Sequence, residues 1–304
     1  MTIKETFQRW MADPPPDRLF EIAESSLAAC SPRSPGQPRC EVLPERGLTA
    51  SPSTPNLSKA FLYRDVLPRI SPLNGKRRPT TAIVIPDYAA RMSILDFQEF
   101  PASEAERAAL IRFRLRKSVP FHIDEAQLSY AVQIDEPKRV EVLAVAIARP
   151  ILEEYETVFT EAGYRVGLVV PSSLAALGLC DAAQPGLTLL VKAAGDSMSV
   201  VLFEQGQVRL VRCLDLTGNE AEAEHPADGD FMLPLLQQTL AYAEDQLGRA
   251  VGTILLCGFG ADSERIGRLA QQEFGVAHAP LRSRFGAASR ETAGLLGLLE
   301  RYAA

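Results

Sequence analysis

The chain has 304 residues, of which 46% are hydrophobic and 23% charged, enough for two domains or for one domain with two lobes. The formal net charge of -6 gives no support to nucleic-acid binding. The longest uncharged stretches, such as 166–180, fall short of the ~20 residues that span a bilayer, and the N-terminus has no secretory apolar core, so a cytoplasmic protein is expected.

The cysteines and histidines form no metal-binding motif. The five cysteines are not spaced as CxxC pairs, and the three histidines lie far apart in the sequence. We therefore expect reduced thiols, histidines with surface or capping roles, and no metal site. The residues concerned are Cys30, Cys40, Cys180, Cys213, Cys257, His122, His225 and His278.

The first predicted element is a helix within residues 1–16 that carries the single tryptophan of the chain. Thr2 and Glu5 have the spacing of a capping box, and the proline run that begins at Pro14 ends the helix. The apolar side chains on one helical face are Ile3, Phe7, Trp10 and Met11. The helix either docks on its own domain or detaches to bind a partner or a membrane surface.

Strands dominate the next part of the chain. A strand, a turn and the start of a second strand are predicted within 18–29, and the Pro- and Ser-rich segment 31–55 is interpreted as a long hairpin excursion. The elements that follow are a short strand at 40–43, a helix at 56–70 capped by Asn56 or Ser58, a buried strand at 80–86 and an alternating strand at 92–97.

A second capped helix begins at Ser103 and is stopped by Pro120. Its first turn carries Glu104 and Glu106, which the helix dipole favours there. Four basic residues gather on its polar side, namely Arg112, Arg114, Arg116 and Lys117. Such a cluster is either a solvated face or a surface for an acidic partner.

The second half alternates strands and helices. Strands are predicted at 126–134, 140–148, 166–170, 252–257 and around Val276, and an antiparallel meander at 187–214. Helices are predicted at 151–162 with Gly163 after the last turn, at 171–179, with an apolar face over 233–247, at 263–274 and at 291–302. The acidic segment 220–230 is expected to be exposed or disordered.

Three segments in this order resemble the PilM family of type IV pilus assembly proteins, in the actin-like ATPase superfamily, and more distantly the cytoplasmic domain of GspL. The matching segments are 112–133, 141–177 and 253–261, with Ala293, Gly294 and Leu295 resembling the C-terminal helix. The resemblance covers most of the chain and is weakest over 31–55. It implies an α/β, actin-like (ribonuclease-H-like) fold with two lobes and a small inserted subdomain.

The domain limits that follow from this resemblance are an N-terminal helix at 1–16, a first lobe at 17–166 with an insert at about 80–135, and a second lobe at 167–304. In the superfamily, two hairpins with Asp-x-Gly turns hold the nucleotide's phosphates, because the carboxylates handle magnesium and water and the glycines let backbone N–H groups approach.

The first hairpin of this sequence departs from that pattern. Glu21 stands where the Asp would be, Ala23 replaces the Gly, and Glu24 adds a negative charge facing the would-be phosphates. Two like charges at ~4 Å repel by about 4 kcal/mol in a partly screened site, so Glu24 would weaken triphosphate binding unless magnesium lay between them.

The second hairpin also departs. Lys192 stands where the Asp would be and Ala194 where the Gly would be, although a shift by one residue restores a glycine at Gly195. On the adenosine side, Phe259 lies between Gly258 and Gly260, where it either blocks the pocket or stacks on a base, unless the glycines serve to turn the chain. The vestigial nucleotide site would comprise Glu21, Ser25, Gly195, Ser197, Gly258, Phe259 and Gly260.

The resemblance implies a non-catalytic cytoplasmic scaffold of the pilus inner-membrane platform, which binds the cytoplasmic tail of PilN and reaches the membrane through that partner. Other pilus platform or motor proteins are further expected partners. The residues expected to bind the tail are Arg112, Arg114, Arg116, Lys117 and Trp10. No cofactor is expected; the alternatives are ATP and magnesium bound without hydrolysis, an active actin-like ATPase, and a GspL-like component of type II secretion.

Overall fold

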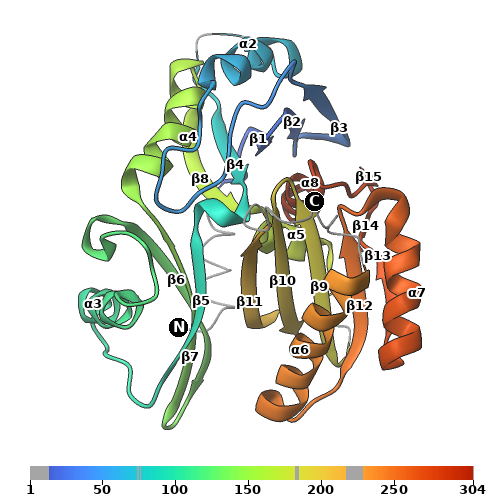
Figure 1. The fold of residues 1–304 in the computed structure, drawn as a ribbon. Coiled ribbons are helices and arrows are strands. Elements are labelled where there is room, and N and C mark those ends of the chain that lie inside the picture. Colours follow the sequence, from blue (N-terminus) through green and yellow to red (C-terminus); the bar gives the residue numbers. More distant parts are fainter. Residues whose placement is uncertain (1–13, 74, 76, 182–184, 217–228, 304) are drawn as a thin grey trace.

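The computed structural model describes residues 14–73, 75, 77–181, 185–216 and 229–303. Trp10 with its predicted helix, and most of the acidic segment 220–230, lie outside these residues. The described chain forms two large sheets with helices and a smaller three-stranded sheet beside them (Figure 1). Among the helices described, none combines the length and the apolar character needed to cross a membrane.

The first sheet has the strand order β3-β2-β1-β4-β8. β1, β2 and β3 are antiparallel, whereas β4 runs parallel to both β1 and β8. The strands are β1 (Arg18–Ala23), β2 (Ser26–Ser31), β3 (Ser34–Val42), β4 (Thr80–Ile85) and β8 (Arg165–Pro171).

Both faces of this sheet are buried. Phe20 and Ile22 pack under α2 (Ala60–Ile70) and α4 (Arg149–Glu161), whereas Leu19 points to the opposite face. That opposite face is covered by α5 (Ser172–Ala176) and α8 (Ala293–Tyr302). Because successive side chains of a strand alternate between faces, Glu21 shares the α8 face with Leu19.

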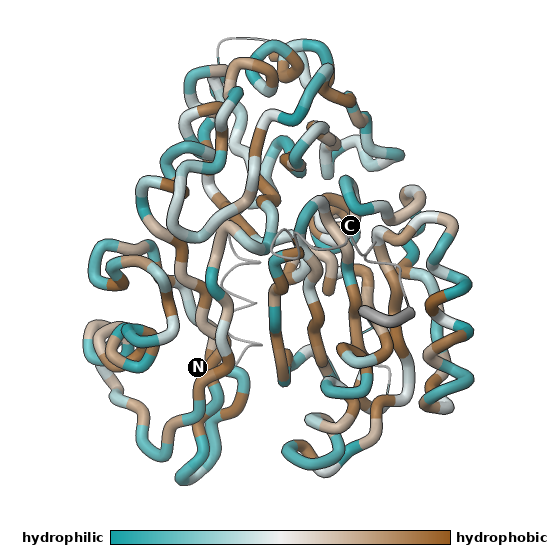
Figure 2. The backbone as a smooth tube through the Cα atoms, in the orientation of Figure 1, coloured by the Kyte–Doolittle hydropathy of each residue, from teal (hydrophilic) through white to brown (hydrophobic). Residues whose placement is uncertain are grey.

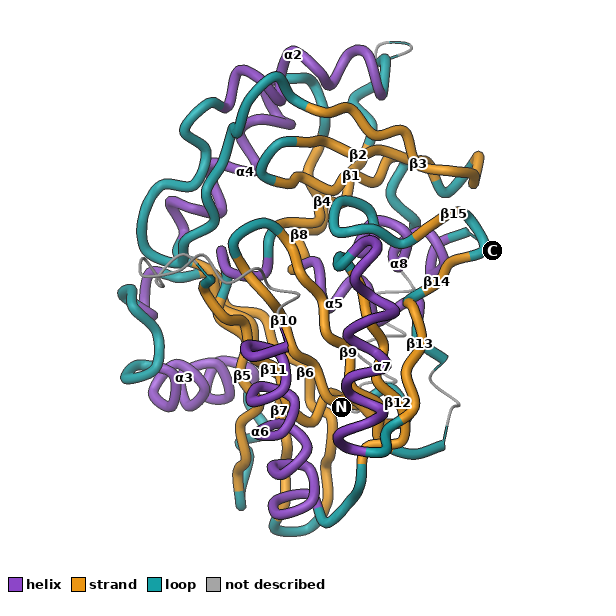
Figure 3. The backbone as a smooth tube through the Cα atoms, turned by 45° about the vertical axis from the view of Figure 1, so that its right-hand side comes forward, coloured by secondary structure: helices purple, strands orange, loops and turns teal. Residues whose placement is uncertain are grey.

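The second sheet repeats the same topology with the order β11-β10-β9-β12-β13. Its first three strands form the predicted antiparallel meander, and β12 runs parallel to β9 and β13. α6 (Gly229–Leu247) and α7 (Ser263–Phe274) cover one face, and in Figure 3 both lie in front of it. The strands are β9 (Leu187–Ala194), β10 (Ser197–Glu204), β11 (Gln207–Asp215), β12 (Val251–Cys257) and β13 (Ala277–Pro280).

The inserted subdomain follows β4 and has the strand order β5-β7-β6. One face packs against α3 (Glu104–Leu115), and the other, with Met92, Ile94 and Leu143, packs against the second sheet. Hydrophobic residues accordingly lie along the strands of all three sheets (Figure 2). The strands are β5 (Arg91–Phe97), β6 (Gln127–Glu136) and β7 (Arg139–Ile147).

Short elements complete the fold. They are the 3-10 turns η1 (Asp87–Ala89), η2 (Ile123–Glu125), η3 (Leu177–Leu179) and η4 (Gly260–Asp262), and the two-stranded pair β14 (Arg282–Ser283) and β15 (Gly286–Ala287).

Most predicted strands and helices are confirmed, but several boundaries differ. The helix expected at 56–70 begins at Ala60, because Asn56 instead organises the preceding loop: its Oδ1 accepts the Ser51 N–H at 2.6 Å and its Nδ2 donates to the Ser51 carbonyl at 2.9 Å. Ser103 lies at the expected helix start, but its side chain makes no capping hydrogen bond.

The lobe limits expected from the sequence also differ from the observed topology. Position 166 falls inside β8, which belongs to the first sheet, and the C-terminal helix α8 returns to pack on that sheet. The insert expected at about 80–135 overlaps β4, whereas the separate sheet extends from Arg91 to Ile147. Pairing between strands that are distant in sequence places β8 in the first sheet and sets the limits of the insert's sheet.

Candidate functional site

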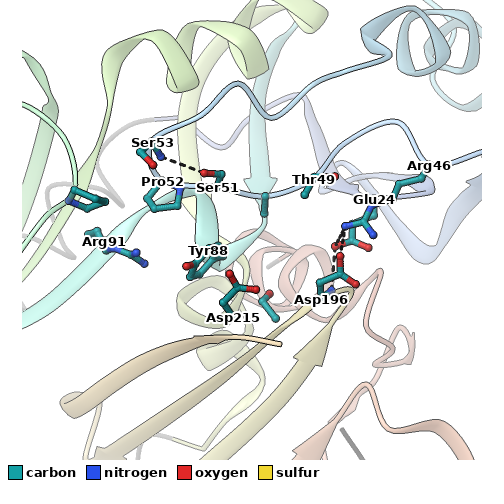
Figure 4. Close-up of a pocket in the computed structure, with 13 residues that line it drawn as sticks. Glu24, Arg46, Thr49, Ser51, Pro52, Ser53, Tyr88, Arg91, Asp196 and Asp215 are labelled. Atoms are coloured by element: carbon teal, nitrogen blue, oxygen red, sulfur yellow. Dashed lines mark hydrogen bonds and ion pairs between the residues drawn. The ribbon is translucent and has the colours of Figure 1, made fainter. Parts of the chain in front are cut away.

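The hairpin turns of the two large sheets meet face to face. Glu24 lies in the β1–β2 turn, and its Oε1 accepts the backbone N–H of Asp196 in the β9–β10 turn at 3.1 Å. Arg46 contacts the Glu24 carboxylate at 3.1 Å and forms an ion pair with the Asp196 carboxylate (Figure 4). We call Glu24, Arg46 and Asp196 the turn clasp.

Gly195 is required for this contact. Its φ of +56° lies in the left-handed region, and a Cβ built there would overlap the Glu24 carboxylate. Burial raises the pKa of Glu24, although the Asp196 N–H and Arg46 act in the opposite direction. The Glu24 carboxylate therefore fills the space beside the β9–β10 turn.

A group of buried charges lies beyond the turn clasp. Glu21 is 2% exposed, and its carboxylate accepts the Ser172 hydroxyl and the Leu295 N–H, the latter at 2.8 Å. Burial raises the pKa of Glu21, against the opposing attraction of Lys192. Both carboxylate oxygens of Glu21 are thus engaged with α5 and α8.

Asp87 and Lys192 complete this group, which we call the buried charge cluster (Glu21, Asp87, Lys192). Asp87 accepts the N–H of Ser173 at 2.8 Å and the hydroxyl of Ser199 at 2.7 Å. Lys192 is 1% exposed, and its Nζ has no hydrogen-bond partner among the described residues. Burial alone would lower the pKa of Lys192, but the negative charges of Asp87 and Glu21 raise it above its ordinary value.

The remaining hairpin residues named from the sequence have structural contacts. Ser25 is exposed in the β1–β2 turn, and its carbonyl accepts the Leu43 N–H at 2.7 Å. Ser197 is buried and donates its hydroxyl to the Ala194 carbonyl at 3.0 Å. The two hairpins are therefore brought together by Glu24 rather than by these serines.

The glycine turn after β12 packs on β9. Gly258 has a φ of +87°, and a Cβ there would overlap the Ala193 carbonyl oxygen. Phe259 is 5% exposed, and its ring belongs to the hydrophobic core beneath α6 and α7. Gly260, with φ +55°, starts η4. In this arrangement the two glycines turn the chain after β12, and Phe259 between them packs in the core.

Arg112 is part of the inserted subdomain's own structure. Its guanidinium donates to the carbonyls of Ile123 and Ala126, in the latter case at 3.1 Å. These bonds tie α3 to the segment before β6.

The other three residues of the basic cluster, Arg114 in α3 and Arg116 and Lys117 directly after it, are exposed. Arg114 lies 5.3 Å from the centre of the Phe97 ring, and Arg116 pairs with Asp124 at 3.0 Å. Lys117 has no ion-pair partner among the residues that the structure describes. The cluster is therefore partly neutralised within its own subdomain.

A cavity of about 310 Å³ opens between the loop after β3, the insert and the second sheet. Arg91 lies in its wall, with its guanidinium 4.9 Å from the centre of the Tyr88 ring. The lining residues are Glu24, Arg46, Thr49, Ala50, Ser51, Pro52, Ser53, Tyr88, Arg91, Pro120, Asp196, Ser197 and Asp215 (Figure 4). Within the described residues, no group of three or more His, Cys, Asp or Glu side chains could hold a metal ion.

The insert is also joined to the second sheet by polar bonds that the sequence did not indicate. The Gln133 amide exchanges two hydrogen bonds with the backbone of Val208, each at 2.7 Å. Beside it, Glu141 and Arg209 form a largely buried ion pair at 2.8 Å. Together with the turn clasp, these bonds hold the two lobes at two separate places.

Asp87 and Arg46 were likewise missed from the sequence. A signal existed for Asp87, which follows a buried strand directly, where polar residues of α/β proteins often gather at a sheet edge. Arg46 lies in an irregular loop with no periodicity, and nothing local indicates that it faces Asp196.

Two sheets with the same strand order, flanked by helices and joined by a central contact of hairpin turns, define an actin-like ATPase fold. The known structures agree. The fold is similar to that of the PilM-PilN type IV pilus biogenesis complex, with a TM-score of 0.73, 19% identity, and coverage of 96% of this chain and 100% of that chain.

A protein of unknown function with an actin-like ATPase fold from Bacteroides thetaiotaomicron is also similar, with a TM-score of 0.53, 14% identity, and coverage of 94% of this chain and 97% of that one. The cytoplasmic domain of EpsL from the type II secretion system of Vibrio cholerae has a TM-score of 0.44 and 11% identity over 79% of this chain and 80% of its own. No family model and no curated protein matches the sequence.

Proposed function

We propose that the chain is a non-catalytic cytoplasmic scaffold of a type IV pilus inner-membrane platform, which binds the cytoplasmic tail of a PilN-like membrane protein and is associated with the membrane through it. The observation that carries the proposal is the similarity to the PilM-PilN complex along the whole of that chain. The bonds that Glu24, Arg46 and Asp196 make with one another in the turn clasp support the absence of catalysis.

The chemistry of the hairpins argues against phosphoryl transfer. Such catalysis depends on carboxylates that hold magnesium and on backbone N–H groups free to bind phosphate. Here the Asp196 N–H already donates to the Glu24 carboxylate. In the second hairpin, Lys192 occupies the position where the superfamily pattern has an aspartate. Glu21 retains a carboxylate, but Ser172 and Leu295 use its oxygens.

We therefore expect purified protein to hydrolyse ATP with magnesium no faster than buffer, because neither metal-holding carboxylate nor phosphate-binding N–H is available. Phosphate release at saturating ATP measures this. Glu21→Gln provides the control, since it preserves the shape of the side chain. Turnover above background that Glu21→Gln or Glu21→Ala abolishes would show an active enzyme and refute the proposal.

We also expect a peptide from the cytoplasmic end of the cognate PilN-like protein to raise the thermal midpoint, since a ligand that binds only the folded state stabilises it by about 2.7 kcal/mol at a hundredfold excess over its Kd. A scrambled peptide should have no effect. The absence of any shift at high excess would contradict the scaffold role.

The contribution of the basic cluster at the end of α3 can be tested with matched charge reversals. Arg116, directly after α3, pairs with Asp124 at 3.0 Å, and Arg268 on α7 pairs with Glu264 at 3.2 Å; both ion pairs are exposed. In the same peptide titration, Arg116→Glu should weaken binding, whereas Arg268→Glu on α7 should not. Equal effects of both reversals would show that α3 is not part of the binding surface.

A further inference from the structure

The β9–β10 turn has the features of an anion site. A backbone N–H that follows a residue in the left-handed region points outward from the turn, and oriented N–H groups of this kind bind anions. Asp196 supplies this N–H directly after Gly195, which has a φ of +56°. The Arg46 guanidinium lies beside it as a charged donor that is shared between the Glu24 and Asp196 carboxylates.

The anion bound at this turn is a side chain of the protein, the Glu24 carboxylate. The Glu24 carboxylate reaches across from the other sheet, 172 residues away in sequence, to accept the Asp196 N–H. Its position is fixed from behind, because the buried Tyr63 hydroxyl donates to the Ala23 carbonyl at 2.7 Å and the Gly47 N–H donates to the Glu24 carbonyl at 2.8 Å. The turn that carries Glu24 is therefore held in place independently of the carboxylate.

We propose that Glu24 is an internal ligand of an anion site on the β9–β10 turn, that it holds the two lobes together without any bound nucleotide, and that its removal leaves a site for a free phosphate ion. The proposal shares with the proposed function the premise that no nucleotide fills the site. Its test uses inorganic phosphate instead of ATP or peptide, so either can fail while the other stands.

The space that Glu24 occupies is small. Glu24 fills the space against Gly195 so closely that a single Cβ there would overlap it. Truncation to alanine vacates a volume of carboxylate size and leaves the Asp196 N–H and Arg46 in place. The Glu24 side chain is 19% exposed, so phosphate can reach the vacancy from solvent.

The experiment compares wild type with Glu24→Ala by thermal unfolding and amide exchange, in chloride and in sodium phosphate at equal ionic strength and pH. In chloride, we expect the variant's Asp196 amide to exchange about tenfold faster and its thermal midpoint to fall by about 2–4 °C, as for one lost charge-assisted hydrogen bond. Phosphate should restore most of both losses in the variant and leave wild type unchanged.

Two further variants keep the result interpretable. Glu24→Gln retains an acceptor and fills the space, so phosphate should not rescue it. Arg46→Ala combined with Glu24→Ala should abolish the rescue. Exchange at Asp196 that is equal in wild type, Glu24→Ala and Glu24→Gln would overturn the proposal, as would equal stabilisation of all four proteins by phosphate. If Glu24→Ala does not fold in chloride, recovery of its folding in phosphate but not in sodium chloride decides the same question.

Discussion

Replacement of Lys192 by methionine should lower the free energy of unfolding by about 3–5 kcal/mol, the cost typical of removing one partner from a buried charge group. Lys192 is 1% exposed, and Glu21 and Asp87 are each 2% exposed. Without the ammonium group, the two carboxylates remain in a low-dielectric interior with no compensating charge. Urea unfolding followed by circular dichroism measures the loss, and Lys117→Met, an exposed site, should change stability by less than about 0.5 kcal/mol.

The loss should depend on pH in a defined direction. Burial already raises the pKa of Glu21, and removal of Lys192 takes away the attraction that opposes this rise. A carboxyl whose pKa is higher in the folded state than its unfolded value of about 4.3 stabilises the fold by taking up a proton, and that benefit disappears as pH rises through the folded-state pKa. The deficit of Lys192→Met should therefore be smaller at pH 5 than at pH 8.

A double variant tests whether the cause is the charge. Glu21→Gln combined with Lys192→Met removes a negative and a positive charge together, so it should be more stable than Lys192→Met alone. If the single variant loses less than about 1 kcal/mol, or if the double variant is simply the sum of both losses, the buried charge cluster does not act as one electrostatic unit.

Gly297→Ala should destabilise the protein by about 3 kcal/mol, although helix propensity alone predicts a gain of about 1 kcal/mol for alanine in place of glycine. A Cβ at Gly297 would overlap the carbonyl oxygen of Ala175 and lie 3.0 Å from the Cα of Ala176. Because these contacts are with backbone atoms, α8 would have to move away from α5. Denaturant unfolding shows directly whether the substitution lowers or raises the free energy of unfolding.

The shift of α8 would be transmitted to the buried charge cluster. The Leu295 N–H at the start of α8 donates to Glu21 at 2.8 Å, so displacement of the helix weakens that bond. Gly36→Ala is the control, since a Cβ at Gly36 meets nothing within 4 Å, and it should change stability by less than about 0.5 kcal/mol. A Gly297→Ala protein as stable as wild type would show that the helices separate at no cost.

These contacts make the pairing of the lobes an intrinsic property of the described chain. α8 lies across the first sheet, the insert packs on the second sheet, and the turn clasp joins the hairpins. A scaffold that must present one surface to a partner benefits from such rigidity, because less conformational entropy is lost on binding. This is consistent with the proposed function and is what the Lys192 and Gly297 variants would weaken.

Local sequence was sufficient to predict helices and strands in which at least one face had to be buried. The run at 80–86 predicted β4 because it is uniformly apolar and β-branched, and the structure confirms it at Thr80–Ile85. Gly163 marked the end of α4 because its φ of +92° is readily adopted only by glycine. The order of such elements was also enough to indicate the actin-like fold, which the structural comparisons confirm.

The candidate site was predicted less completely. Glu21, Glu24, Gly195 and Lys192 were identified from their positions in the two hairpins, but their partners were not. Arg46, which pairs with Asp196 from a position 150 residues away, had no local signal. Arg112 was expected to face a partner, yet it is used to hold the Ile123 and Ala126 carbonyls within its own subdomain.

The sequence by itself determined most of the secondary structure and the hairpins' departure from a phosphate-binding pattern, because periodicity, turn residues and side-chain charge are local properties. Only the tertiary structure decided that α8 closes the first sheet and that Glu24 occupies the turn of the second. Both depend on backbone and side chains that meet across more than 150 residues of chain, where shape and charge complementarity, absent from any single segment, select the partner.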